Sequence, residues 1–281
     1  MFRKILLAGA ALCVSAPSLA ATQAIIVGNL VPDAATGPTG PAVILVEDGR
    51  IKNIAKGTNN PFQADTVVDL STKTLVPGLI DLHVHLTGDP GDDFRDEAVK
   101  PDEWGVIMGV KNAALTVKAG FTTVREAGSA QNTAFVLRRG TAEGRIVGPR
   151  IIAAGPALSI VGGHGDVTGF RSDVLAALDS GFTCTGPVEC AEKVRKSSKA
   201  GSDVIKITAT GGVLSQQGRG LEAHFTNEEM VSIANTAHSL GLKVMAHAHG
   251  ARGVEAAAAA GQTVAPAATR PICPWFQPDP T

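Results

Sequence analysis

The sequence has few aromatic and charged side chains: 4% of its 281 residues are aromatic, none is Tyr, and 18% are charged. Its 4 cysteines are too few for a small scaffold held together by disulfides. It also lacks an excess of charge, because 25 basic and 26 acidic side chains leave a formal net charge of −1. Nucleic-acid-binding proteins usually carry a clearly basic balance, so we expect no nucleic-acid partner.

No apolar run reaches the ~20 residues of a membrane span, so we expect no membrane-spanning helix. The first twenty residues are typical of a secretory signal. Arg3 and Lys4 form a charged start, residues 5–14 an apolar stretch, and residues 18–20 a cleavage site. We therefore predict that residues 1–20 are a signal peptide and that the protein is periplasmic or secreted.

Three cysteines remain once Cys13 leaves with the signal. In an oxidising compartment Cys184 and Cys190 could close a small loop, and the alternative is two free thiols. Their spacing, without a nearby histidine, is a poor zinc-ribbon pattern. Cys273 is left without a partner.

Residues 21–75 are expected to form a small all-β unit. Four short apolar runs carry this prediction, and Asp48-Gly49 is typical of a hairpin turn between two of them. The runs lie at residues 24–27, 43–47, 50–55 and 66–70.

From about residue 75, strand patterns alternate with helix patterns, which predicts a parallel sheet, either doubly wound or closed into a barrel. The expected strands lie at 75–85, 121–126, 150–154, 204–208 and 243–247. The expected helices lie at 103–119, 132–143, 188–200, 226–240 and 254–260. We therefore assign residues 76–261 to this α/β region. The pattern stops after Gly261, so residues 262–281 are expected to be a proline-rich tail.

The strongest candidate site is Asp81-Leu82-His83-Val84-His85, at the end of an apolar strand. Side chains alternate along a strand, so Asp81, His83 and His85 share one face. Two imidazoles spaced in this way can converge on one metal ion, and Asp81 could accept the second ring proton of a histidine. The alternative is a pair of exposed strand histidines.

Lys206 lies in the otherwise apolar run 204–208, where a lone ammonium would be costly to bury. Burial lowers a lysine pKa, and a neutral amine can react with carbon dioxide to give a carbamate, an anionic oxygen ligand. The alternative is a lysine whose ammonium reaches the solvent.

His247 and His249 share a face at the end of another strand, and His164 lies in a glycine-rich loop. For His164 a substrate-contacting role and a structural role both stay open. The carboxyl ends of strands form the active-site face of a parallel barrel, so these histidines and Lys206 are expected to converge there. A set of imidazoles and one lysine favours Zn²⁺ or a similar metal over Mg²⁺ or Ca²⁺.

Five motifs together resemble the amidohydrolase superfamily, in its Xaa-Pro dipeptidase and imidazolonepropionase-like branch. They are VPGLIDLHVHL at 76–86, GFTTVREAG at 120–128, GGHGD at 162–166, IKITATGGVLS at 205–215 and MAHAHG at 245–250.

The resemblance implies a (β/α)₈ TIM barrel that follows a small β-sandwich unit, and one or two zinc ions. It implies that His83 and His85 bind the more buried metal and that carboxylated Lys206 bridges to a second, held by His247 or alternatively His249. A metal hydroxide would attack the carbonyl carbon of an amide. The implied substrates are dipeptides or N-acyl amino acids, with Lys206 and His164 as the catalytic candidates.

The resemblance is incomplete, because the family pattern continues with a strand-6 histidine and a strand-8 aspartate and no histidine follows His249. About five strand–helix units are expected where a closed barrel needs eight. We therefore expect an incomplete TIM barrel in a C-terminally truncated chain with reduced or no activity. The alternatives are a cyclic-amide hydrolase, similar to imidazolonepropionase or dihydroorotase, and a non-catalytic metal-binding fragment. The sequence does not decide whether the chain forms a homo-oligomer.

Overall fold

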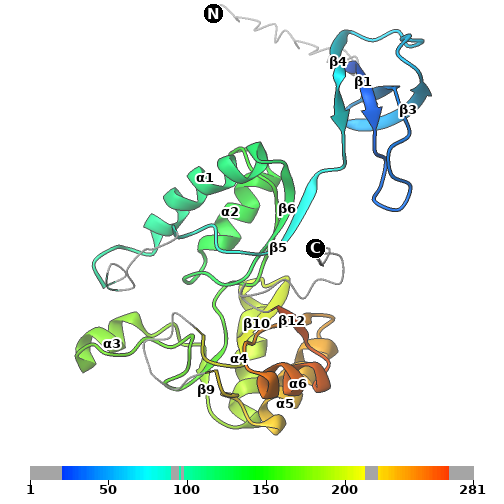
Figure 1. Ribbon diagram of the computed structural model, residues 1–281. Coiled ribbons are helices and arrows are strands. Elements are labelled where there is room, and N and C mark those ends of the chain that lie inside the picture. The colour runs from blue at the N-terminus through cyan, green and yellow to red at the C-terminus, as the bar shows by residue number, and fades with distance from the viewer. Residues whose placement is uncertain (1–20, 90–94, 96–97, 213–220, 266–281) are drawn as a thin grey trace, which may run out of the picture. The chain divides into compact units, whose positions relative to one another are not determined.

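A computed structural model shows the fold of the chain (Figure 1). It describes residues 21–89, 95, 98–212 and 221–265. Contacts divide the chain between Pro77 and Gly78 into two units, each with a buried core of its own.

The first unit is one four-stranded sheet with the strand order β3-β2-β1-β4. Its strands are β1 (Thr22–Leu30), β2 (Ala42–Glu47), β3 (Arg50–Lys56) and β4 (Thr66–Leu75). Asp48 and Gly49 have φ angles of 50° and 70°, the positive values that a tight hairpin turn between β2 and β3 requires. The described residues therefore show the expected hairpin, but in a single sheet and not in a sandwich of two.

The second unit alternates strands and helices. Its first half contains β5 (Leu79–Val84), α1 (Glu103–Lys118), β6 (Phe121–Glu126), α2 (Thr133–Ala142) and β7 (Arg150–Ala153). A connecting region follows, with β8 (Ser159–Ile160), α3 (Ser172–Leu178) and β9 (Thr183–Cys184). The second half contains α4 (Pro187–Ala200), β10 (Val204–Thr208), α5 (Asn227–Ser239), β11 (Lys243–His247), α6 (Ala251–Ala259) and β12 (Thr263–Ala265).

Two parallel three-stranded sheets form the centre of this unit, β5-β6-β7 and β10-β11-β12. Figure 1 shows α1 and α2 beside the first sheet and α4, α5 and α6 beside the second. Each sheet has its own buried core with its helices, and a third cluster contains residues from both halves, among them Ala127, Ala154, Val204 and Met245. The two sheets are further joined by the Asp203 carboxylate, whose Oδ2 accepts a hydrogen bond of 2.8 Å from the backbone N–H of Ala153. This is the α/β arrangement of an incomplete parallel barrel.

The elements differ from the sequence-based expectation in three places. The predicted strand 75–85 divides, because Leu75 ends β4 while β5 begins at Leu79 after the Pro77-Gly78 break. The glycine-rich connection contains β8, α3 and β9, which were not expected because each is short. Residues 263–265 form β12, paired in parallel with β11, although no strand was expected beyond Gly261. Three residues are too few to show a strand period, and pairing with β11 defines this strand.

Both ends of the parallel arrangement are open in the described part of the chain. There β5 pairs only with β6, and β12 pairs only with β11. Ile80 and Leu82 of β5 are 62% and 56% exposed. None of the described helices is both long enough and apolar enough to cross a lipid bilayer.

A disulfide joins Cys184 at the end of β9 to Cys190 in the first turns of α4, with both side chains fully buried and their Cα atoms 5.1 Å apart. We expect Cys184 and Cys190 of the purified and denatured chain to react with iodoacetamide only after dithiothreitol is added. Intact mass measures the number of labelled cysteines. Labelling of Cys184 and Cys190 before reduction would contradict the bridge.

The start of α5 contains a capping box formed by Thr226 and Glu229. The Thr226 hydroxyl accepts from the Glu229 N–H, and the Glu229 carboxylate accepts from the N–H groups of Thr226 (2.8 Å) and of Gly186 at the start of α4 (2.6 Å). We expect Thr226→Ala to cost about 1 kcal/mol of unfolding free energy in a urea titration, because it removes the cap. Asn235→Ala, at an exposed position of the same helix, is the control and should not destabilise the chain, because Ala has a higher helix propensity than Asn. Equal effects of the two substitutions would contradict the role of the cap.

Candidate metal and catalytic site

Lys206 lies in the middle of β10, all five residues of which are buried, and only 3% of its surface is exposed. Burial is the main cause that lowers the pKa of the Lys206 amine to about 8, and the charge of Arg125 contributes in the same direction. A lysine with this pKa has a substantial neutral fraction near pH 8, which is the form that reacts as a nucleophile.

His83 and His85 lie beside this amine. The Nζ atom of Lys206 is 3.5 Å from Nε2 of His83, and the two imidazole rings are 5.4 Å apart between centroids. Nδ1 of His85 is 2.9 Å from the carbonyl oxygen of Gly128. Because a carbonyl only accepts, this contact places the ring proton on Nδ1 and leaves the Nε2 lone pair available for a ligand.

Asp81 does not contact a histidine ring as expected. Its Oδ1 accepts a hydrogen bond of 2.9 Å from the backbone N–H of His83. The pairing of β5 with β6 is irregular between Asp81 and Val84, so strict alternation of side chains does not hold there. Asp81 therefore shapes the backbone at the end of β5.

His247 ends β11 and contacts two other histidines. Its ring is stacked on that of His164 with centroids 4.3 Å apart, and it meets the ring of His249 edge-on at 4.7 Å. The backbone N–H of His164 also lies 3.4 Å from Nδ1 of His224. A Cβ atom at Gly212 would lie 2.8 Å from Nε2 of His247, so only glycine lets this loop approach the rings so closely.

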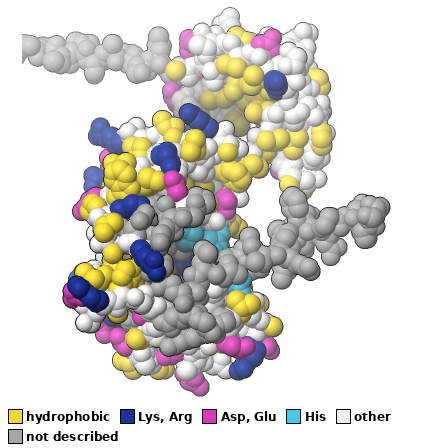
Figure 2. Space-filling view, turned by 60° about the vertical axis from the view of Figure 1, so that its left-hand side comes forward, with side chains coloured by type: hydrophobic (Ala, Val, Ile, Leu, Met, Phe, Trp, Pro, Cys, Tyr) yellow, Lys and Arg dark blue, Asp and Glu magenta, His cyan; other side chains and the backbone are white. Residues whose placement is uncertain are grey.

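These imidazoles are held in the neutral form. Burial is the main cause that lowers the pKa values of His83 and His247 to about 3 and that of His164 to about 4. The positive charge of Lys206 contributes to the shift of all three rings. The Lys206 amine is therefore close enough to His83, His164 and His247 to influence the charge of each ring. Figure 2 shows histidine side chains close together on one face of the molecule.

Glu126, the last residue of β6, is part of this region but was not expected from the sequence. It is fully buried, and burial raises its pKa to about 8. Its Oε2 accepts a hydrogen bond of 2.6 Å from the backbone N–H of Leu86, and its Oε1 lies 3.8 Å from Nδ1 of His85. The signal in the sequence was a single acidic residue at the end of the predicted strand 121–126.

The imidazole nitrogens and the Lys206 side chain at this site are of the kinds that bind zinc. Among the described residues, Nε2 of His247 and Nε2 of His249 are buried without a hydrogen-bond partner, as an imidazole that awaits a metal would be. Neutral imidazoles and a lysine of lowered pKa are further suitable donors. Within the same residues, however, no three His, Cys, Asp or Glu side chains are already arranged to hold a metal ion. Lysine is the additional donor that such a site would require.

Known proteins are similar to this chain in sequence and in fold. The profile of the family described as "Amidohydrolase family" matches residues 74–266. Ochratoxinase of Aspergillus niger is 30% identical over 245 residues, which cover 80% of this chain and 50% of that protein. A dihydroorotase of Geobacter sulfurreducens is 30% identical over 229 residues, 78% of this chain and 47% of that protein.

A solved structure, described as a Xaa-Pro dipeptidase with bound methionine in the active site, superposes with a TM-score of 0.78 at 33% identity. The superposition covers 86% of this chain and 60% of that one. The chain thus spans about half the length of the curated relatives that it matches.

Two substitutions test the hydrogen bond that Glu126 accepts from the backbone N–H of Leu86. Glu126→Gln keeps an oxygen acceptor for the buried N–H of Leu86, whereas Glu126→Leu leaves that N–H unpaired. We expect Glu126→Leu to lower the unfolding free energy of the metal-free chain by about 1–3 kcal/mol relative to Glu126→Gln, as measured by urea denaturation. Equal stabilities of the two variants would show that the hydrogen bond to Leu86 does not hold the end of β5.

Proposed function

This chain belongs to the amidohydrolase family, and we propose that it carries the active-site residues of a zinc-dependent hydrolase of amide bonds. The observation that carries the proposal is the buried Lys206 amine, 3.5 Å from Nε2 of His83 and close enough to the other histidines to lower their pKa values. The burial of a lysine beside neutral imidazoles costs free energy, and metal binding would account for its presence.

Four residues would hold the metal. His83 and His85 would bind zinc through ring nitrogens, with His247 or alternatively His249 as a further imidazole ligand. Lys206 would contribute an oxygen ligand after its neutral Nζ attacks the carbon of carbon dioxide, which forms an N–C bond and releases one proton. When bound, zinc would supply a Lewis acid that polarises the amide carbonyl and makes water acidic enough to attack it near neutral pH.

The other residues of the site position these groups. The Gly128 carbonyl fixes the tautomer of His85, and the carboxyl group of Glu126 holds the backbone just beyond this histidine. His164, neutral near pH 7 and stacked on His247, would donate a hydrogen bond to the substrate carbonyl oxygen as negative charge develops there.

For the substrate we propose dipeptides or N-acyl amino acids. The similarity to a Xaa-Pro dipeptidase and to ochratoxinase supports this class. A cyclic-amide hydrolase is the second candidate, supported by the similarity to dihydroorotase. A metal-binding protein without catalysis is the third, supported by the open strand edges and by the absence of a ready three-ligand group among the described residues.

We further propose that the protein acts in the periplasm or outside the cell. The signal-like pattern of residues 1–20 supports this proposal. The disulfide between Cys184 and Cys190 is consistent with an oxidising compartment.

Zinc binding tests the ligand assignment. Loss of a group that only supports metal ligands costs about 10–100-fold in metal affinity, and loss of a ligand should cost at least that. We expect His83→Ala and Lys206→Met each to weaken zinc binding by at least about tenfold in a competition with a chromophoric chelator, in buffer containing bicarbonate. His238→Ala, an exposed position of α5, is the control and should bind zinc as the unchanged chain does. Equal zinc affinity in all four chains would contradict the site.

Hydrolysis separates the candidate functions. On the proposed function, the zinc-loaded chain should release amino acid from N-acetyl amino acids or dipeptides, at the reduced rate expected from the sequence, as measured by mass spectrometry. The His83→Ala chain should not. Preferential opening of dihydroorotate would favour the cyclic-amide hydrolase, and bound zinc without turnover of any of these compounds would favour the non-catalytic protein.

A further inference from the structure

The chain just beyond β10 contains a buried hydroxyl group that the proposed function leaves unused, that of Thr210. Thr210 lies two residues after the end of β10 and four after Lys206, and it is fully buried. Its hydroxyl donates a hydrogen bond of 2.7 Å to the carbonyl oxygen of Gly211 and accepts one of 3.0 Å from the backbone N–H of His249. A buried hydroxyl that both donates and accepts fixes the groups it joins, because breaking either bond would leave a polar group unpaired.

The bond to His249 replaces one that a regular parallel ladder would supply. Strands β10 and β11 pair in parallel, and at the end of this pairing the N–H of Ala209 donates to the carbonyl of His247 at 2.9 Å. A regular parallel ladder would continue with the N–H of His249 donating to the carbonyl of Ala209. That carbonyl instead accepts the N–H of His224 at 2.8 Å. The hydroxyl of Thr210 therefore pairs the N–H of His249, while the segment that carries His224 joins the end of β10.

The loop that follows Thr210 passes close to the histidine rings. A Cβ atom at Gly212 would lie 2.8 Å from Nε2 of His247 and 3.2 Å from Cε1 of His164. A Cβ atom at Gly253 in α6 would lie only 2.1 Å from Cγ2 of Thr210. The methyl group of Thr210 thus packs on α6 while its hydroxyl bonds the end of β11, and these two contacts define the orientation of a side chain whose χ1 angle is already restricted.

We propose that Thr210 is a positioning residue of the metal site, whose hydroxyl holds the backbone at His249 so that the rings of His247 and His249 keep the arrangement that binds zinc. The proposal rests on the proposed function, because zinc is the ion that these rings would bind. Within the described residues both Nε2 atoms are buried without a hydrogen-bond partner, and the two ring centroids are 4.7 Å apart. A shift of the His249 backbone would change this arrangement directly.

Two substitutions separate the hydroxyl of Thr210 from its methyl group. Thr210→Val keeps the shape and removes the hydroxyl, whereas Thr210→Ser keeps the hydroxyl and removes the methyl group. We expect Thr210→Val to weaken zinc binding about 10–100-fold in the chelator competition, as loss of a group that supports metal ligands does, and Thr210→Ser to bind zinc as the unchanged chain does.

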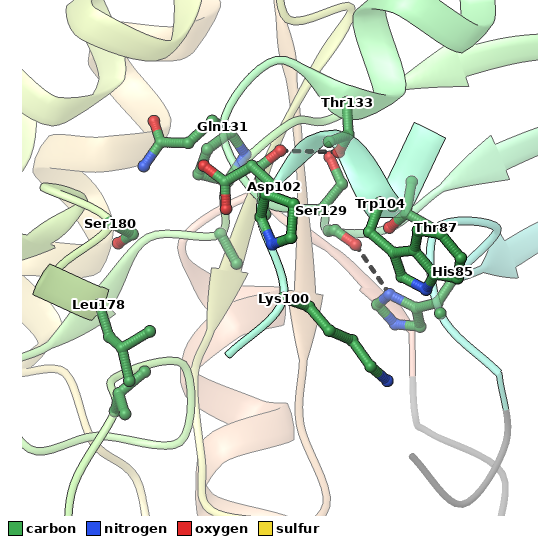
Figure 3. A pocket seen from close by; sticks show the side chains of 18 of the residues that line it. His85, Thr87, Lys100, Asp102, Trp104, Ser129, Gln131, Thr133, Leu178 and Ser180 are labelled. Carbon is green, nitrogen blue, oxygen red and sulfur yellow. Dashed lines mark hydrogen bonds between the residues drawn. The ribbon is translucent and has the colours of Figure 1, made fainter. Parts of the chain in front are cut away.

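Thr141→Val is the matched control. It removes the hydrogen bond of 3.1 Å that another threonine hydroxyl donates to the carbonyl of Arg138, near the end of α2, and it should not change the zinc affinity. Neither Thr210 nor Thr141 lines the cavity of about 490 Å³ that opens beside His85 (Figure 3). A change in metal binding therefore reports on the histidines and not on the wall of this cavity.

The visible absorption of bound Co²⁺ is a second readout, because it depends on the geometry of the ligands. The spectrum should change in Thr210→Val and stay the same in Thr210→Ser and Thr141→Val. A loss of stability without a movement of the ligands would leave the spectrum unchanged.

Hydrogen exchange of the His249 amide tests the bond in the metal-free chain. We expect slow exchange, measured by NMR, in the unchanged chain and in Thr210→Ser, and faster exchange in Thr210→Val, whose folding is checked by circular dichroism. If Thr210→Val does not fold, Thr210→Ser decides. Unchanged zinc affinity in Thr210→Ser would support the role of the hydroxyl, and weaker binding would assign the role to the methyl group and overturn the proposal.

The outcomes separate this proposal from the proposed function. Equal zinc affinity of Thr210→Val and the unchanged chain, an unchanged Co²⁺ spectrum in Thr210→Val, or fast exchange of the His249 amide in the unchanged chain would overturn the role of Thr210 and leave the zinc site in place. Absence of zinc binding by the unchanged chain would overturn the proposed function together with the role of Thr210 at the metal.

Discussion

The burial of one amine, that of Lys206, is the constraint on which the rest of the site depends. An ammonium at 3% exposure is stable only if its surroundings change its charge state or supply a compensating anion. The buried acidic side chains among the described residues are Glu126 and Glu229, and Glu229 is committed to the ends of α4 and α5. The charge of Glu126 raises the pKa of Lys206, but burial of the amine, the largest cause, and the charge of Arg125 act in the opposite direction. The net result is the lowered pKa of the amine.

The fold brings this amine to histidines that are distant in the sequence. Strands β5 and β6 run parallel in one sheet, and β10 and β11 run parallel in the other. Nζ of Lys206 in β10 lies 3.5 Å from Nε2 of His83 in β5, although the two residues are 123 positions apart. Each sheet is stabilised separately by its helices. A further cluster, which includes Ala154 and Val204, packs residues of the two halves together. The charge of Lys206 contributes to the lowered pKa values of His83, His164 and His247, which come from both halves and the connection between them.

The parts of this arrangement that depend on local sequence could be predicted, and the parts that depend on long-range contacts could not. Strands β6, β10 and β11 and the cap of α5 follow from periodicity and from short motifs. The strand β12 could not be predicted, since its three residues are defined by pairing with β11. The same holds for Glu126, whose importance comes from a hydrogen bond to a residue 40 positions away. Asp81 was assigned a ring contact because the irregular pairing of β5 with β6 is invisible in the sequence.

The charge balance also explains why a carbamate on Lys206 would suit this site better than the amine. Neutral imidazoles leave the full charge of a zinc ion uncompensated, and a nearby ammonium would add to it. Carbamate formation would replace a positive group by a negative one, which changes the local charge by two units. That change would remove the electrostatic contribution that now lowers the pKa values of His83, His164 and His247, but burial, their main cause, would remain. The imidazoles would therefore stay neutral and able to bind a metal in either state of the lysine.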